Sequence, residues 1–247
     1  MNEDVPGQET QLPEELPTGE SFHIQAEQAR ERGNFLDALR LTDEASIKYQ
    51  QEGNVAKFAE VQSSRFLTFR HLFEQTGDVS FKILAQHAVE SSVDIIRNSG
   101  DKVGLGIPLY NLAKWYETVG EYEKSIASMK EALAAFEAAP EDPQGLSSVK
   151  AAIGTRLAAF EYRLGDDSAL SRFNSTLSSL VSNPHPDSYT QNVWVSGSHM
   201  HLADSYLVRG NKDAARGQAG KAKAIIDSDE RLKLRAGQLA KLEQKLA

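Results

Sequence analysis

The sequence has no cysteine among its 247 residues. This absence excludes disulfide bonds, thiolate metal sites and a cysteine nucleophile. It is compatible with a reducing compartment, and we expect a cytoplasmic protein. No run of about 18 apolar residues occurs either, so no membrane insertion is expected. Residues 1–20 contain neither the basic region nor the apolar region of a signal peptide.

Basic residues are in the minority, with 27 Lys and Arg against 35 Asp and Glu. The resulting net charge of -8 argues against nucleic acid as a general partner. The first 20 residues hold six acids, no base and three prolines, whereas the chain from Arg209 onward holds ten bases against five acids. We expect residues 1–18 to form a disordered acidic tail and residues 19–247 to form a single domain.

The sequence also lacks the common motifs of catalysis and cofactor binding. It contains no P-loop, no nucleophile elbow and no His-Glu-x-x-His segment. His199 and His201 are two residues apart, which places them on different sides of a helix and prevents them from sharing a metal. We therefore expect no enzyme activity, no cofactor and no metal site. An enzyme with an unrecognised site remains a third alternative to the two binding functions considered below.

What the sequence does contain is a long repeat. Five glycines are spaced by 44, 43, 45 and 45 residues, and each is followed by Asn, Asp or Glu: Gly33, Gly77, Gly120, Gly165 and Gly210. Glycine accepts the left-handed conformation at the C-terminal end of a helix, and an adjacent Asn or Asp caps the next helix. Each glycine is therefore predicted to be the corner of a helix hairpin.

The positions of small residues agree with this interpretation. Seven residues before the glycine, four of the five units have alanine: Ala26, Ala113, Ala158 and Ala203. Two helices approach closely where a small residue of one meets a large residue of the other. The fourth unit fits better with a slip of one residue, which places Tyr162 where other units have Phe73, Tyr116 and Tyr206.

The pattern predicts ten helices in hairpins and one further helix. Their expected ranges are 19–32, 35–51, 55–75, 79–98, 102–119, 121–138, 143–163, 167–181, 187–209, 212–226 and 229–246. Ser228 is the expected N-cap of the last helix, which carries Leu232, Leu239, Leu242 and Leu246. We interpret it as a cap over the apolar face of the last repeat. The alternative is a short coiled-coil dimer seam.

These features together resemble the tetratricopeptide repeat (TPR). The third unit carries the pattern best, in Leu109, Leu112, Ala113, Tyr116, Gly120, Tyr122, Ser125, Met129 and Ala132. The period near 44 residues departs from the usual 34 and is similar to the long-helix variants of kinesin light chains and bacterial regulatory proteins. The resemblance implies an all-α fold, namely a right-handed α-solenoid of about five helix hairpins plus a C-terminal capping helix.

The resemblance also implies that the first helix of each hairpin lines a concave groove. The candidate groove residues are His71, Tyr110, Asn111, Lys114, Glu117, Thr155, Met200 and Asp204. Tyr110 is the expected anchor because Lys114 lies one helical turn further on. Packing in the core is the alternative for Tyr110, Trp115 and Trp194. Chaperone-binding members of this family hold two carboxylates in a clamp of lysine, asparagine and arginine side chains. This sequence does not contain that clamp, and Asn111 with Lys114 is the only fragment of it.

We therefore expect a non-enzymatic adaptor or scaffold that binds a segment of a partner protein in the groove. The alternative is a regulatory TPR protein that senses a short peptide. The expected partner is a protein or peptide, without nucleic acid, and the chain is expected to be a monomer or a weak homo-oligomer.

Overall fold

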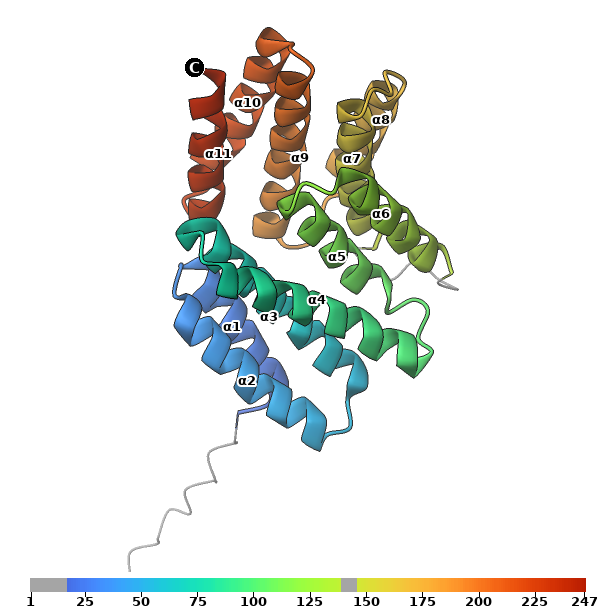
Figure 1. The fold of residues 1–247 in the computed structure, drawn as a ribbon, viewed down its shortest axis with the longest axis vertical. Coiled ribbons are helices and arrows are strands. Elements are labelled where there is room, and N and C mark those ends of the chain that lie inside the picture. The colour runs from blue at the N-terminus through green and yellow to red at the C-terminus, as the bar shows by residue number, and fades with distance from the viewer. Residues whose placement is uncertain (1–16, 139–145) are drawn as a thin grey trace, which may run out of the picture.

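The computed structural model describes residues 17–138 and 146–247, and this part of the chain consists of helices without any strand. Figure 1 shows their arrangement. The helices are α1 (Gly19–Glu31), α2 (Phe35–Gln51), α3 (Val55–Thr76), α4 (Val79–Ser99), α5 (Gly106–Thr118), α6 (Tyr122–Glu137), α7 (Leu146–Arg163), α8 (Ala169–Ser182), α9 (Ser188–Val208), α10 (Lys212–Asp227) and α11 (Lys233–Leu246).

Consecutive helices pair as five hairpins: α1 with α2, α3 with α4, α5 with α6, α7 with α8, and α9 with α10. The hairpins stack side by side into a right-handed α-solenoid, and α11 covers the last of them. The predicted fold class is thus confirmed. Residues 1–16 of the expected acidic tail lie outside the described residues. Thr18 is the N-cap of α1, and its hydroxyl accepts a hydrogen bond of 3.1 Å from the Ser21 amide.

All five corner glycines have positive φ, between 71° at Gly77 and 112° at Gly165. At Gly120 the Gly120 amide donates to the Glu117 carbonyl at 3.0 Å and the Glu121 amide donates to the Tyr116 carbonyl at 2.8 Å. This pair of bonds is the Schellman ending of a helix, which requires a left-handed residue. Glycine is therefore needed at the corners for its backbone conformation.

The residue after each corner glycine is expected to cap the next helix, and it does so at only some of the corners. Asp78 accepts from the Ser80 amide and Asn211 accepts from the Ala214 amide, each as an N-cap. Asn34 and Glu121 occupy the same place in their hairpins but make no capping bond with their side chains. At these corners the Schellman bonds set the turn, and the N-cap side chain adds nothing to it.

The repeated alanines lie where the two helices of a hairpin meet. Ala113 and Ala203 have no exposed surface, and Ala26 and Ala158 are exposed by 1% and 2%. Large apolar side chains fill the space around them, most densely in the third and fourth hairpins, where Leu109, Met129 and Phe173 are buried. Burying such a side chain stabilises the fold by about 1.5–3 kcal/mol.

The capping helix begins at Lys233, four residues later than predicted. Ser228 ends α10, and Asp229 holds a turn by accepting from the Arg231 amide at 3.1 Å. Four leucines, Leu232, Leu239, Leu242 and Leu246, are buried in one core with residues of α9 and α10. Because these leucines pack against α9 and α10 of the same chain, α11 caps the solenoid, and the four leucines are not exposed for a coiled coil with a second copy.

The helix α5 also starts late, at Gly106 where the sequence predicted residue 102. The Asp101 side chain accepts from the Gly104 amide at 2.9 Å and holds residues 102–105 in turns. The start predicted for α7, at residue 143, lies outside the described residues.

Candidate functional site: a central cavity

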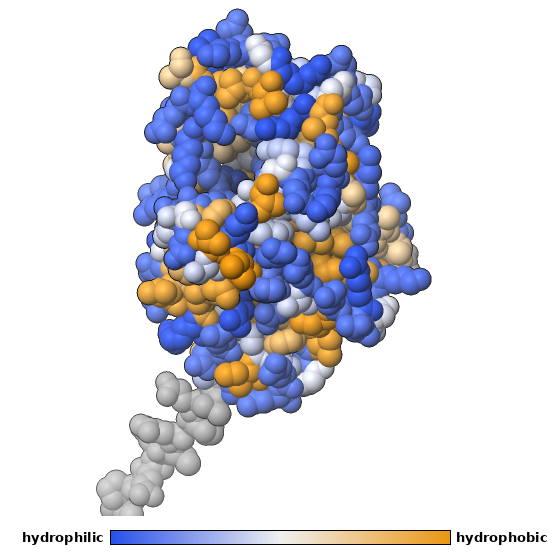
Figure 2. All heavy atoms as spheres, viewed as in Figure 1, coloured by the Kyte–Doolittle hydropathy of each residue, from blue (hydrophilic) through white to orange (hydrophobic). Residues whose placement is uncertain are grey.

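The concave side of the solenoid encloses a cavity of about 340 Å³. Its walls come from the first helix of every hairpin, α1, α3, α5, α7 and α9, together with the capping helix α11. The molecular surface is hollowed between α9 and α11, and the surrounding face is largely hydrophilic (Figure 2). The five hairpins therefore direct their inner side chains into one shared, half-enclosed space.

Two side-chain contacts join the ends of the solenoid across this space. The Tyr189 hydroxyl on α9 donates to the Glu31 carboxylate on α1, and the Lys241 ammonium on α11 donates to the Glu74 carbonyl oxygen on α3 at 3.2 Å. The partners are 158 and 167 residues apart in the chain. Burial raises the pKa of Tyr189, and the Glu31 carboxylate raises it further. These contacts bring the last hairpin and the cap against the first two hairpins (Figure 1).

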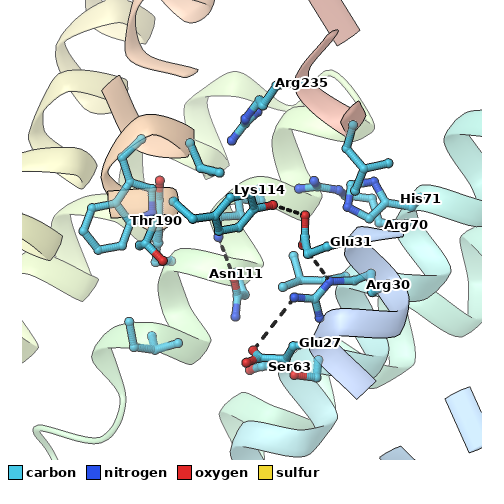
Figure 3. Close-up of a pocket in the computed structure, with 18 of the residues that line it drawn as sticks. Glu27, Arg30, Glu31, Ser63, Arg70, His71, Asn111, Lys114, Thr190 and Arg235 are labelled. Carbon is cyan, nitrogen blue, oxygen red and sulfur yellow. Dashed lines mark hydrogen bonds and ion pairs between the residues drawn. The ribbon is translucent and has the colours of Figure 1, made fainter. Parts of the chain in front are cut away.

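Five cationic side chains line the cavity: Arg30, Arg70, Lys114, Arg156 and Arg235. Three of them have carboxylate partners in the wall or directly behind it. Arg30 lies 3.8 Å from Glu27 and 3.4 Å from Glu31, Arg70 lies 3.2 Å from Glu74, and Arg156 lies 3.6 Å from Glu117. The arrangement of Arg30 between its two carboxylates is visible in Figure 3.

Lys114 and Arg235 have no such partner, because no carboxylate of the described residues lies within 4.0 Å of either side chain. The Lys114 ammonium donates to the Asn111 side-chain oxygen at 2.9 Å and lies 4.2 Å from the centre of the Tyr110 ring. The Arg235 guanidinium donates to Gln238 at 2.7 Å and reaches from α11 into the cavity (Figure 3).

The electrostatic consequences are the same for both groups. Burial lowers the pKa of Lys114 well below its ordinary value, and the nearby arginines Arg156, Arg70, Arg235 and Arg30 lower it further. Burial is also the main cause that lowers the pKa of Arg235 to about 10, followed by Arg156 and Arg70. Both groups therefore lie in a positive field that their own hydrogen-bond partners do not neutralise.

Behind Tyr110, three ionisable groups satisfy one another. Arg156 donates through Nε to His201 Nε2 at 2.9 Å, so the histidine proton belongs on Nδ1, which faces Glu117 at 3.2 Å. Burial opposes ionisation of Glu117, but Arg156 and His201 outweigh it and lower the pKa of that carboxyl. Burial also opposes the charged form of His201 and, together with Arg156, lowers the pKa of its ring. The group stays a charged pair with a neutral histidine and fixes one wall of the cavity.

His71 lies on the opposite wall and is also engaged. Its ring is stacked on Phe35 with centres 6.0 Å apart, and its Nδ1 lies 3.4 Å from the Glu74 carboxylate. Burial lowers the pKa of His71 more than Glu74 raises it. Burial would raise the pKa of Glu74, but Arg70 and His71 lower it to about 2. The Glu74 carboxylate is therefore ionised beside Arg70 at neutral pH.

Four of the eight residues predicted for the groove line this cavity: His71, Tyr110, Asn111 and Lys114. The other four lie elsewhere. Glu117 lies behind the cavity wall, and Met200 is buried in the core beneath α11. Thr155 is fully buried, with its hydroxyl 2.7 Å from that of Ser198. Asp204 forms an ion pair with Arg163 at 2.6 Å. In the last hairpin the lining lies at the N-terminal end of α9, at Tyr189, Thr190, Val193 and Trp194.

Several lining residues escaped the sequence analysis as site candidates, above all Arg70, Arg156, Arg235 and Trp194. The one-residue slip that Tyr162 indicated in the fourth unit also moves Arg156 onto the lining. Trp115 is 3% exposed and belongs to the core, as its alternative interpretation stated, whereas Trp194 lines the cavity. No repeat position signalled Arg235, because the capping helix lies outside the repeat.

Within residues 17–138 and 146–247, no three His, Cys, Asp or Glu side chains form a group able to hold a metal ion. None of the described helices is long and apolar enough to cross a membrane.

Comparisons with known proteins give a likeness in structure. No protein-family model and no curated protein sequence matches the chain. BtubC (BKLC) from P. vanneervenii is similar in structure with a TM-score of 0.55 and 19% identity, over 85% of this chain and 80% of that one. A putative kinesin light chain with nearly identical TPR-like repeats from Podospora anserina is similar with a TM-score of 0.53 and 15% identity, over 87% and 99%. The chain therefore has the fold of TPR-like repeat proteins.

Proposed function

We propose that this protein is a non-enzymatic adaptor or scaffold that holds a segment of a partner protein on its concave side. One observation carries the proposal: the first helices of five hairpins turn inner side chains into a single half-enclosed cavity. Helical repeats use such concave surfaces to bind extended segments. The cavity offers aromatic, apolar and charged groups together, in Tyr110, Trp194, Leu67 and Lys114.

Binding is favoured over catalysis by the state of the polar groups. The most enzyme-like set, Glu117, His201 and Arg156, is closed on itself, because both nitrogens of the histidine ring are engaged. A general base needs a free acceptor within reach of substrate. The TPR-like fold is also one that typically serves protein interaction.

We also propose that the domain spans residues 19–247 and belongs to the long-helix class with a period near 44 residues. Contacts between neighbouring hairpins support this period. The Thr155 and Ser198 hydroxyls, 43 residues apart, lie 2.7 Å from one another, and the Ser205 hydroxyl donates to the Ala159 carbonyl 46 residues away at 2.8 Å. The cysteine-free composition fits a cytoplasmic setting, and burial of the α11 leucines fits a monomer or a weak homo-oligomer.

The test is site-specific photo-crosslinking with purified full-length protein in an extract of the source cells. A photoreactive residue replaces Val193, which lines the cavity, and the matched control replaces Leu36, which is 78% exposed on α2. We expect a discrete crosslinked partner from the position of Val193 and none from that of Leu36. The same adducts from both positions would contradict groove binding.

The partner segment identified in this way is then synthesised and titrated against the purified protein. Val193→Trp should fill the cavity and weaken binding, whereas Leu36→Trp should leave it unchanged. A folded protein as the crosslinked species supports the adaptor, and a free oligopeptide supports the alternative, a peptide-sensing regulator. The contacts of Tyr189 and Lys241 across the opening favour that second candidate, since a ligand that alters them would change the closure of the solenoid.

A further inference from the structure

The wall of the cavity balances its charges in number but not in position. Five cations line it together with Glu27, Glu31 and Glu60, and Glu74 and Glu117 lie just behind. Glu60, however, pairs with Lys57 at 2.9 Å, and the other four carboxylates lie beside Arg30, Arg70 and Arg156. The positive charge left without a partner is that of Lys114 and Arg235.

Both side chains are partly withdrawn from solvent into the cavity and have no counter-ion there among the described residues. A cation removed from water loses solvation, and only a nearby anion or a full set of acceptors restores it. Lys114 has three N–H donors and one neutral acceptor, Asn111, besides the Tyr110 ring. Arg235 has five N–H donors and one neutral acceptor, Gln238. The two side chains project from α5 and α11 into the same space with donors to spare.

The dimensions of the space restrict what occupies it. A cavity of about 340 Å³ is at the lower end of the range of small-molecule sites, which is roughly 300–1,000 Å³. A recess of about 20 Å³ opens beside Arg235, between Ser198 and His201, and is large enough for a single oxygen or water. Apolar groups, Leu67, Ile107, Val193 and Leu234, complete the walls.

We propose that the cavity binds a small polyvalent oxyanion, a molecule of metabolite size whose carboxylate or phosphate groups contact Lys114 and Arg235. This ligand differs from the partner segment of the proposed function, and because Val193, Lys114 and Arg235 line the same cavity, the two would bind in competition. Bound between α5 and α11, it would link the middle of the solenoid to its cap. Charge-assisted hydrogen bonds from an ammonium and a guanidinium are the strong contacts expected for such an anion.

The experiment is isothermal titration calorimetry of the full-length protein with two probes, citrate for carboxylates and pyrophosphate for phosphates. Sodium chloride at matched ionic strength is the blank. We expect saturable binding of at least one probe with one ligand per chain. Lys114→Met and Arg235→Met should each weaken it by about ten-fold or more, since each removes one charged contact. Lys212→Met, an exposed lysine of α10, is the control and should bind like the wild type.

Circular dichroism melts of all variants establish that each remains folded. Binding of citrate alone assigns carboxylates, binding of pyrophosphate alone assigns phosphates, and binding of both supports the shared anion chemistry. The absence of saturable binding of either probe to the wild type overturns the inference. Binding that survives both cavity variants overturns it as well. Neither failure affects crosslinking of a partner from position 193, so the anion site and the adaptor function stand or fall separately.

Discussion

The same substitution, glycine to alanine, should change stability in opposite directions at two positions of this protein. Gly120 ends the first helix of the third hairpin with φ of +81°, whereas Gly217 lies inside α10 without positive φ. An added Cβ meets no heavy atom within 4 Å at either position. The backbone conformation is therefore the only structural difference between the two changes.

The magnitudes follow from the conformations. The left-handed conformation costs a residue with a Cβ about 1–2 kcal/mol. Alanine also lowers the conformational entropy of the unfolded chain, which stabilises the folded state by about 0.4–1 kcal/mol. Gly120→Ala should therefore lower the free energy of unfolding by about 1 kcal/mol. Gly217→Ala should raise it by about 0.8–1 kcal/mol, because alanine is the better residue in a helix interior.

The assay is urea unfolding and thermal melting of both variants, followed by far-UV circular dichroism. For a domain of this size, about 1 kcal/mol corresponds to a shift of roughly 2–4 °C in melting temperature. The two variants should thus differ by roughly 4–8 °C, with the wild type between them. Shifts of the same sign would refute the assignment of Gly120 as a left-handed corner whose role is conformational.

Three further predictions concern packing, charge and closure. Ala113→Leu should destabilise the protein by about 1–3 kcal/mol in urea melts, because Ala113 is fully buried, and Ala135→Leu on a half-exposed flank should cost less; equal costs would contradict the register. Lys114→Met should be more stable than the wild type at neutral pH. The pKa of Lys114 is lower in the folded protein than in the unfolded chain, so above the folded pKa the unfolded chain binds more protons. The free energy of unfolding of the wild type should therefore rise toward pH 10.5, and the difference in stability between Lys114→Met and the wild type should become smaller. A difference that does not change with pH would contradict a lowered pKa of Lys114. Tyr189→Phe removes the hydroxyl bound to Glu31, so small-angle scattering should show a larger radius than for the wild type, and an unchanged radius would mean that packing alone closes the solenoid.

The sequence alone determined the architecture of this protein, because the relevant signals are local. At Gly120 the helix ends through bonds from the Gly120 and Glu121 amides to the carbonyls three and four residues before the glycine. The Ala113 carbonyl likewise accepts from Ser125 of the same hairpin. Such features recur at a fixed spacing and can be read from one unit at a time. The early starts predicted for α5 and α11 failed because the side chains of Asp101 and Asp229 hold turns that compete with the helix.

The cavity was decided by the tertiary structure. Tyr110, Asn111 and Lys114 could be placed on its wall because α5 follows the repeat register. Arg235 could not, since it reaches the same space from a helix outside the repeat. The closure of the solenoid, in which Tyr189 meets Glu31 across 158 residues, depends on small rotations summed over all the hairpins. No single unit encodes that sum, so the partners of the inner charges follow from the completed fold and not from any local pattern.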